Sequence, residues 1–166
     1  MKSIKKLLLV LAILACSTQG AYSQGFSRGS SIVDLGLSLG WGFSPQVRYE
    51  YGLTDKIGPG RIGVGAVVGM SFFSAQSYRY GVLLFGPQAN YHLDLAGITR
   101  DLDLYFGLGV YFGTLATGEY ISGYSFGPYV GWHLGFRYWF SPKVGGFVQV
   151  GATGGTGVAF GLSFNL

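Results

Sequence analysis

Apolar side chains in this chain recur at every second position, and after residue 23 no apolar run is long enough to form a membrane-spanning helix. Such a helix needs about 20 consecutive apolar residues. A period of two places alternate side chains on opposite faces of an extended chain, which is the pattern of a β-strand with one apolar face. The sequence therefore predicts strands rather than helices for its apolar content.

This alternation occurs in eight segments. In the segment 102–113, leucine, phenylalanine and valine occupy every even position, while Asp103, tyrosine and glycine occupy the odd ones. Similar patterns cover residues 33–41, 47–53, 62–72, 82–92, 102–113, 126–138, 147–152 and 160–166. Eight alternating segments of about ten residues are typical of a transmembrane barrel. The predicted fold class is all-β, a single antiparallel up-and-down barrel of eight strands.

The composition of the two faces predicts which one is inside. The apolar face carries leucine, valine and phenylalanine, whereas the other consists mostly of glycine, serine and tyrosine, and the chain has 30 glycines. A soluble β-sandwich or lipocalin-type barrel would turn the large apolar face inward, because glycine cannot fill a core. The interior of an eight-stranded barrel is narrow and suits small residues. We therefore expect the apolar face to contact lipid.

The first residues resemble a secretory signal. Lys2, Lys5 and Lys6 precede a uniformly apolar stretch at 7–15, which is too short to span a bilayer. We expect cleavage after Ser23, which gives a signal peptide at 1–23 and a barrel domain at 24–166. Residues 13–16 loosely resemble a lipoprotein cleavage box, so lipidation of Cys16 is the alternative.

Removal of the signal peptide changes both the charge and the thiol content. Eight lysines and arginines then remain against seven aspartates and glutamates, a net charge of +1, and no cysteine is left. A nearly neutral protein gives no electrostatic argument for nucleic-acid binding. Without cysteine, disulfides and thiol chemistry are excluded from the mature chain.

The segments between the predicted strands are short. With both ends of the barrel in the periplasm, the segments 54–60, 94–101 and 141–143 are periplasmic. The external connections are expected around 43–46, 74–79, 114–123 and 153–156. The segment 114–123 alone is long enough to present a modest binding surface.

Charged and imidazole side chains on the inward face are the candidate site residues. Buried charges must be paired, so these residues predict a polar plug that fills the barrel. The alternative is a gated or selective pore, and the outer half could hold a water-filled pocket beside Gly69, Gly109 and Tyr111. The predicted plug consists of Asp34, Arg48, Glu50, His92, Asp103, His133 and Arg137.

The sequence gives no support for catalysis, a cofactor or a metal site. A lipid-modifying barrel enzyme needs His, Ser and an acid together, but His133 has only Ser125 on its face, eight residues away. Two histidines on different strands without thiolates make a poor metal site. We therefore expect no enzymatic activity, and we rank a lipid-modifying enzyme as the least favoured function.

Three blocks resemble a known family. The sequences at 47–55, 101–109 and 135–145 read VRYEYGLTD, DLDLYFGLG and GFRYWFSPKVG. They resemble small outer-membrane barrels of the OmpA/OmpX-like, "porin family" type, particularly the versions common in Bacteroidetes. This resemblance implies an outer-membrane location and a structural or envelope-interaction role, with a narrow pore for ions or small solutes as the alternative.

The end of the chain also resembles this family. Gly161, Phe164 and Leu166 are similar to the C-terminal signal that the barrel-assembly machinery reads, although the terminal residue is Leu rather than an aromatic. The resemblance implies outer-membrane lipid, periplasmic chaperones and the barrel-assembly machinery as partners. We expect a monomer.

Overall fold

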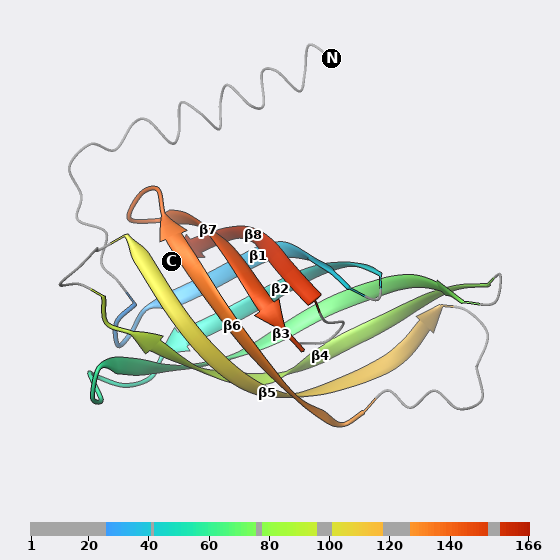
Figure 1. Ribbon diagram of the computed structural model, residues 1–166, viewed down its shortest axis with the longest axis horizontal. Helices are drawn as coiled ribbons and strands as arrows, with labels where there is room; N and C mark the ends of the chain where they lie inside the picture. The colour runs from blue at the N-terminus through green and yellow to red at the C-terminus, as the bar shows by residue number, and fades with distance from the viewer. Residues whose placement is uncertain (1–25, 41, 76–77, 96–100, 118–126, 153–156) are drawn as a thin grey trace, which may run out of the picture.

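The chain forms one closed β-barrel (Figure 1). The computed structural model describes residues 26–40, 42–75, 78–95, 101–117, 127–152 and 157–166. Each strand pairs antiparallel with the next, and β8 pairs with β1 to close the sheet. The strands are β1 (Ser31–Leu39), β2 (Phe43–Gly52), β3 (Gly60–Ala75), β4 (Tyr78–Leu93), β5 (Leu102–Thr117), β6 (Tyr129–Trp139), β7 (Val144–Gly151) and β8 (Gly157–Asn165). The predicted eight-stranded antiparallel up-and-down barrel is confirmed.

None of the described residues belongs to a helix that is long and apolar enough to cross a membrane.

The two ends of the barrel differ. The turn end carries the connections β2–β3, β4–β5 and β6–β7, together with residues 26–30 and Leu166. The loop end carries the other four connections. At the loop end, β3, β4 and β5 extend beyond their neighbours, because β2 stops pairing with β3 at Phe72 and β6 stops pairing with β5 at Tyr111.

One predicted external connection is wrong, and another is shorter than predicted. The segment 43–46 belongs to β2, since Ser44 and Pro45 continue the ladder opposite Ser38 and Leu37, and only 40–42 join β1 to β2. The segment 74–79 lies mostly in strands, because β3 runs to Ala75 and β4 starts at Tyr78. Proline has no backbone N–H to donate, but Pro45 is still accommodated in the ladder opposite Leu37.

Other predicted boundaries shift less or fall outside the described residues. β5 continues to Thr117, so the connection predicted at 114–123 begins later than expected. β6 begins at Tyr129 rather than at 126. Cys16, the cleavage site, Ser125 and the connection at 153–156 lie outside the described residues.

Each strand places polar or small residues inside and apolar residues outside. In β2, Arg48 and Glu50 are 2% and 1% exposed, whereas their neighbours Val47, Tyr49 and Tyr51 are 44%, 44% and 41% exposed. The same alternation continues in β6, where every second residue from Gly131 to Trp139 is buried. The polar and glycine-rich face is therefore inside and the apolar face outside, as predicted.

Inward glycines make room for large inward side chains. Tyr105 on β5 lies directly opposite Gly135 on β6, and a Cβ added at Gly135 would be 2.5 Å from Cζ of Tyr105. The ring of Phe147 on β7 reaches past β8 to Gly36 on β1, where an added Cβ would be 2.6 Å from its Cζ atom. Glycine and aromatic residues therefore fill the narrow interior together, as side chains must in a barrel of this size.

This complementarity predicts a difference between two glycine substitutions. Gly135→Ala should lower the free energy of unfolding by about 1–3 kcal/mol, because the new methyl group overlaps the buried Tyr105 ring. Gly146→Ala is the matched control, since Gly146 faces outward and its closest neighbour is the ring of the exposed Phe140, 3.1 Å from an added Cβ. Urea unfolding in detergent would measure both, and equal stabilities would contradict the packing described here.

Candidate functional site

Six ionisable side chains meet inside the barrel near its turn end. They are buried, and five strands supply them: β1, β2, β4, β5 and β6. We call them the charge cluster: Asp34, Arg48, Glu50, His92, Asp103 and Arg137. His133, the seventh side chain of the predicted plug, is also buried but lies beside this cluster rather than in it. The structure thus brings together the residues that the sequence pattern selected.

Arg137 is the hub of the charge cluster. Its Nη2 atom is 2.9 Å from Oδ2 of Asp34 and 2.6 Å from Oε2 of Glu50, and its Nη1 atom is 3.0 Å from Oδ2 of Asp103. Its Nε atom donates to Oδ1 of Asp34 over 3.3 Å. One guanidinium on β6 therefore binds carboxylates from β1, β2 and β5. The planar fork of arginine allows this, because it presents five donors in fixed directions.

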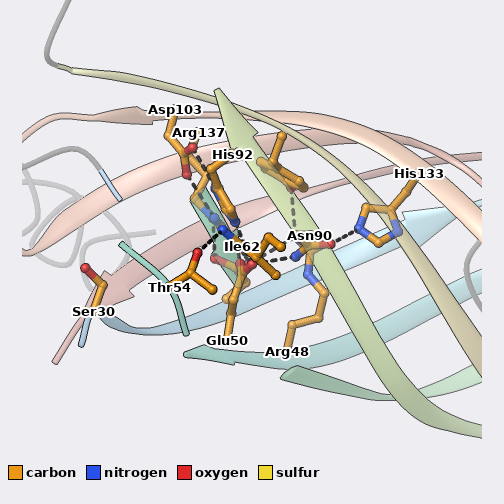
Figure 2. A network of polar contacts seen from close by, with 12 residues as sticks. Ser30, Arg48, Glu50, Thr54, Ile62, Asn90, His92, Asp103, His133 and Arg137 are labelled. Carbon is orange, nitrogen blue, oxygen red and sulfur yellow. Dashed lines mark hydrogen bonds and ion pairs between the residues drawn. The ribbon is translucent and has the colours of Figure 1, made fainter. Parts of the chain in front are cut away.

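His92 bridges two of the same carboxylates (Figure 2). Its Nε2 atom is 2.7 Å from Oε1 of Glu50, and its Nδ1 atom is 2.8 Å from Oδ1 of Asp103. A neutral imidazole has one donor nitrogen, whereas both nitrogens here face carboxylate oxygens. With both carboxylates ionised, His92 is the imidazolium cation. The three carboxylates of the cluster are then balanced by His92, Arg48 and Arg137.

Arg48 joins the cluster to an aromatic layer above it. Its Nη2 atom is 3.0 Å from Oδ2 of Asp34 and donates to the hydroxyl of Tyr105 over 3.3 Å. Its guanidinium carbon lies 4.5 Å from the centre of the Phe147 ring, and that of Arg137 lies 4.6 Å from the centre of the Tyr105 ring. Both cations are therefore held by ring faces as well as by carboxylates, a favourable contact when it is desolvated.

His133 reaches the cluster through an amide. Its Nε2 atom is 2.7 Å from Oδ1 of Asn90, and the Asn90 amide nitrogen donates to Oε1 of Glu50 over 2.6 Å. Since the amide oxygen of Asn90 can only accept, Nε2 of His133 must donate. Figure 2 shows Asn90 between His133 and the acidic residues. His133 is thus a member of the hydrogen-bond network without being an ion-pair partner.

Sequence reasoning missed several members of this network. Asn90, Tyr105 and Ser163 all lie on the inward face, and Ser163 donates to Oδ1 of Asp34 over 2.6 Å. Asn90 and Tyr105 could have been found from the sequence. Asn90 lies two residues from His92, and Tyr105 lies two residues from Asp103, each on the same face of its strand. Phe26, whose ring stacks on His92, lies before the first alternating segment and gave no such signal.

The polar atoms of the site are largely bonded to one another. Both nitrogens of His92 are occupied by carboxylates, so neither is free to act as a base. The hydroxyl of Ser163, beside the charge cluster, donates to the carboxylate of Asp34. Among the described residues, no group of three or more His, Cys, Asp or Glu side chains is placed to hold a metal ion.

The interior above the cluster is filled largely by Tyr111. Its ring lies against Gly109 and Gly131, where added Cβ atoms would be 2.5 Å and 2.7 Å from the tyrosine. A cavity of about 10 Å³ remains beside it, which is room for about one water molecule. The cavity is lined by Ser44, Gln46, Val67, Gly69, Leu84, Phe85 and Tyr111. This small cavity lies beside Gly69 and Tyr111, two of the residues at which a water-filled pocket was hypothesised.

Comparison with known proteins supports the fold. No protein-family model matches the sequence, and no curated protein matches it. The structure is similar to the N-terminal β-barrel domain of Pseudomonas aeruginosa OprF, with a TM-score of 0.57 and 16% sequence identity. The similarity covers 84% of this chain and 98% of that domain. At this identity the likeness is one of fold.

The hub geometry predicts a large effect for Arg137. Arg137→Ala should lower the free energy of unfolding by about 3–5 kcal/mol, because it leaves three buried carboxylates with too few cations. Arg28→Ala is the control, since the ion pair of Arg28 with Asp55 is exposed and should contribute at most about 1 kcal/mol. Denaturant unfolding would compare the two variants, and a similar small loss for both would contradict the role of Arg137.

Proposed function

We propose that this protein is an integral barrel of the outer membrane with a structural or envelope-interaction role, no catalytic activity and an interior closed by the charge cluster. The observation that carries the proposal is the combination of an apolar outer surface with a charged interior filled by side chains. A soluble protein of this size buries its large apolar side chains and exposes its charges. In this protein many large apolar side chains are exposed, and six ionisable side chains are buried in the charge cluster.

The apolar outer surface continues around the barrel. Large apolar side chains that are at least 36% exposed occur on all eight strands, among them Leu35, Val47, Val68, Phe85, Leu108, Trp132, Val150 and Leu162. A soluble monomer rarely exposes an apolar patch larger than a few hundred Å². Lipid is the environment in which such a surface is stable, and a closed barrel satisfies its backbone hydrogen bonds there.

Exposed charges at the turn end lie outside this surface. Among the residues whose side-chain exposure is described, the exposed charged side chains are those of Arg28, Asp55, Lys56 and Lys143, and all four lie before β1 or in the turns of the turn end. A charged side chain is costly in the hydrocarbon region but not in water. Their position supports a membrane boundary at the turn end, which we assign to the periplasm.

The residues of the C-terminal motif lie on or next to the strand that closes the barrel. Gly161 and Phe164 belong to β8, Leu166 follows directly, and β8 pairs with both β7 and β1. This position fits the proposed recognition of the last strand by the barrel-assembly machinery after delivery by periplasmic chaperones. A closed sheet has no free long edge, which is compatible with a monomer in outer-membrane lipid.

Membrane embedding predicts that the cost of an added charge depends on depth. Leu108, in the middle of β5, is 51% exposed. Leu108→Arg should lower the free energy of unfolding in lipid vesicles by about 2–4 kcal/mol, whereas Phe140→Arg at the turn end should cost at most about 1 kcal/mol. Equal, small costs for both variants would indicate a surface that contacts water.

The closed interior predicts a silent barrel. In planar bilayers the wild-type protein should show no steady conductance, and Arg137→Ala should open a path by removing the hub of the charge cluster. Arg137→Lys is the matched control, because it keeps a cation at the same place. The Arg137→Lys barrel should therefore be closed for a larger fraction of the time than the Arg137→Ala barrel. Steady current through the wild type would contradict the plug and favour a narrow pore.

A further inference from the structure

Residues 26–30 fold across the turn end of the barrel before β1 begins. The amide of Gly29 donates to the carbonyl of Gly52 over 2.9 Å, and the amide of Gly52 donates to the carbonyl of Ser30 over 2.8 Å. A tight turn, closed by the amide of Ser30 and the carbonyl of Ser27 at 3.1 Å, holds the segment in this path. Gly29 has a φ of 85°, which other residues adopt at a cost.

This turn places the ring of Phe26 inside the barrel. Phe26 is 4% exposed and packs with Ile32 and Trp139 in an apolar cluster. On its other side the ring stacks on His92, with 3.6 Å between ring centres and 12° between planes. Gly63 leaves the space for it, because a Cβ there would be 2.7 Å from Cζ of Phe26. The pocket is therefore shaped for an aromatic ring.

The stacked position matters because of how His92 is bound. Carboxylates occupy both nitrogens of His92 in the plane of its ring, so the ring face is what remains to be covered. Phe26 covers that face. An aromatic ring over a cation is attractive, and more so when water is excluded. Phe26 thus separates a charged group from the solvent at the turn end.

We propose that residues 26–30 are a stopper that closes the turn end and keeps water and small ions away from the charge cluster. This goes beyond the proposed function, because it adds a second closure built from a segment that belongs to no strand. The ion pair of Arg28 with Asp55 is largely exposed, at 64% and 77% of the side chains. The stopper is therefore held by Phe26 and the backbone hydrogen bonds rather than by this pair.

Trp139 reports on the stopper, because it is 5% exposed and packs with Phe26. In a Trp41→Phe/Trp132→Phe background it is the one tryptophan left in the chain. Iodide, which stays in water, should quench Trp139 weakly in that background. Phe26→Ala should raise the quenching constant severalfold, whereas Arg28→Ala and the exposed Phe140→Ala should leave it unchanged. Circular dichroism in the same detergent would establish that each variant is folded.

A second variant tests the stopper with Phe26 intact. Gly29→Val strains the turn at a positive φ without altering the pocket, so it should also raise the iodide quenching of Trp139. If iodide quenched Trp139 no more strongly in folded Phe26→Ala and Gly29→Val than in the parent protein, the proposal would be overturned. The quenching measurement needs neither conduction nor an outer-membrane location. Its result is therefore independent of whether the barrel conducts, and failure of the stopper proposal can be told apart from failure of the proposed function.

Discussion

Neutralisation of buried charge is the constraint on which the rest of this interior depends. Ionised groups cannot be taken out of water unless they are paired and hydrogen-bonded. Arg137 meets this requirement by binding three carboxylates, and His92 and Arg48 supply the remaining positive charge. The residues around them follow from this arrangement, because Asn90 and Ser163 occupy carboxylate lone pairs that the cations leave free.

The packing around the cluster depends on size as much as on charge. An eight-stranded barrel has little internal width, so a tyrosine on one strand requires a glycine on the next. Tyr105 opposite Gly135 satisfies this rule and at the same time places its ring beside Arg137 and its hydroxyl beside Arg48. The many glycines of the sequence therefore have a structural role in holding the ion pairs in place.

Much of this arrangement could be predicted from alternation alone, and the rest could not for identifiable reasons. The period of two places Asp34, Arg48 and Arg137 on the glycine-rich face of their strands, and the composition of that face assigns it to the interior. Their pairing could not be read, since it depends on the register between strands and on which strands face each other across the barrel. The start of β2 was misplaced because the predicted alternating segment begins only at Val47, and Phe26 was missed because it lies outside every alternating segment.

The long-range ion pairs of Arg137 also bear on how the barrel forms. Arg137 and Asp34 are 103 residues apart in the chain, and their strands β6 and β1 are not neighbours in the sheet. In an open, partly assembled sheet these two strands would stand near opposite edges. The Asp34–Arg48 and Asp103–Arg137 pairs join neighbouring strands and need no closure, whereas the contacts of Arg137 with Asp34 and Glu50 cross the barrel. Arg137 therefore obtains its full set of carboxylate partners only in the closed barrel.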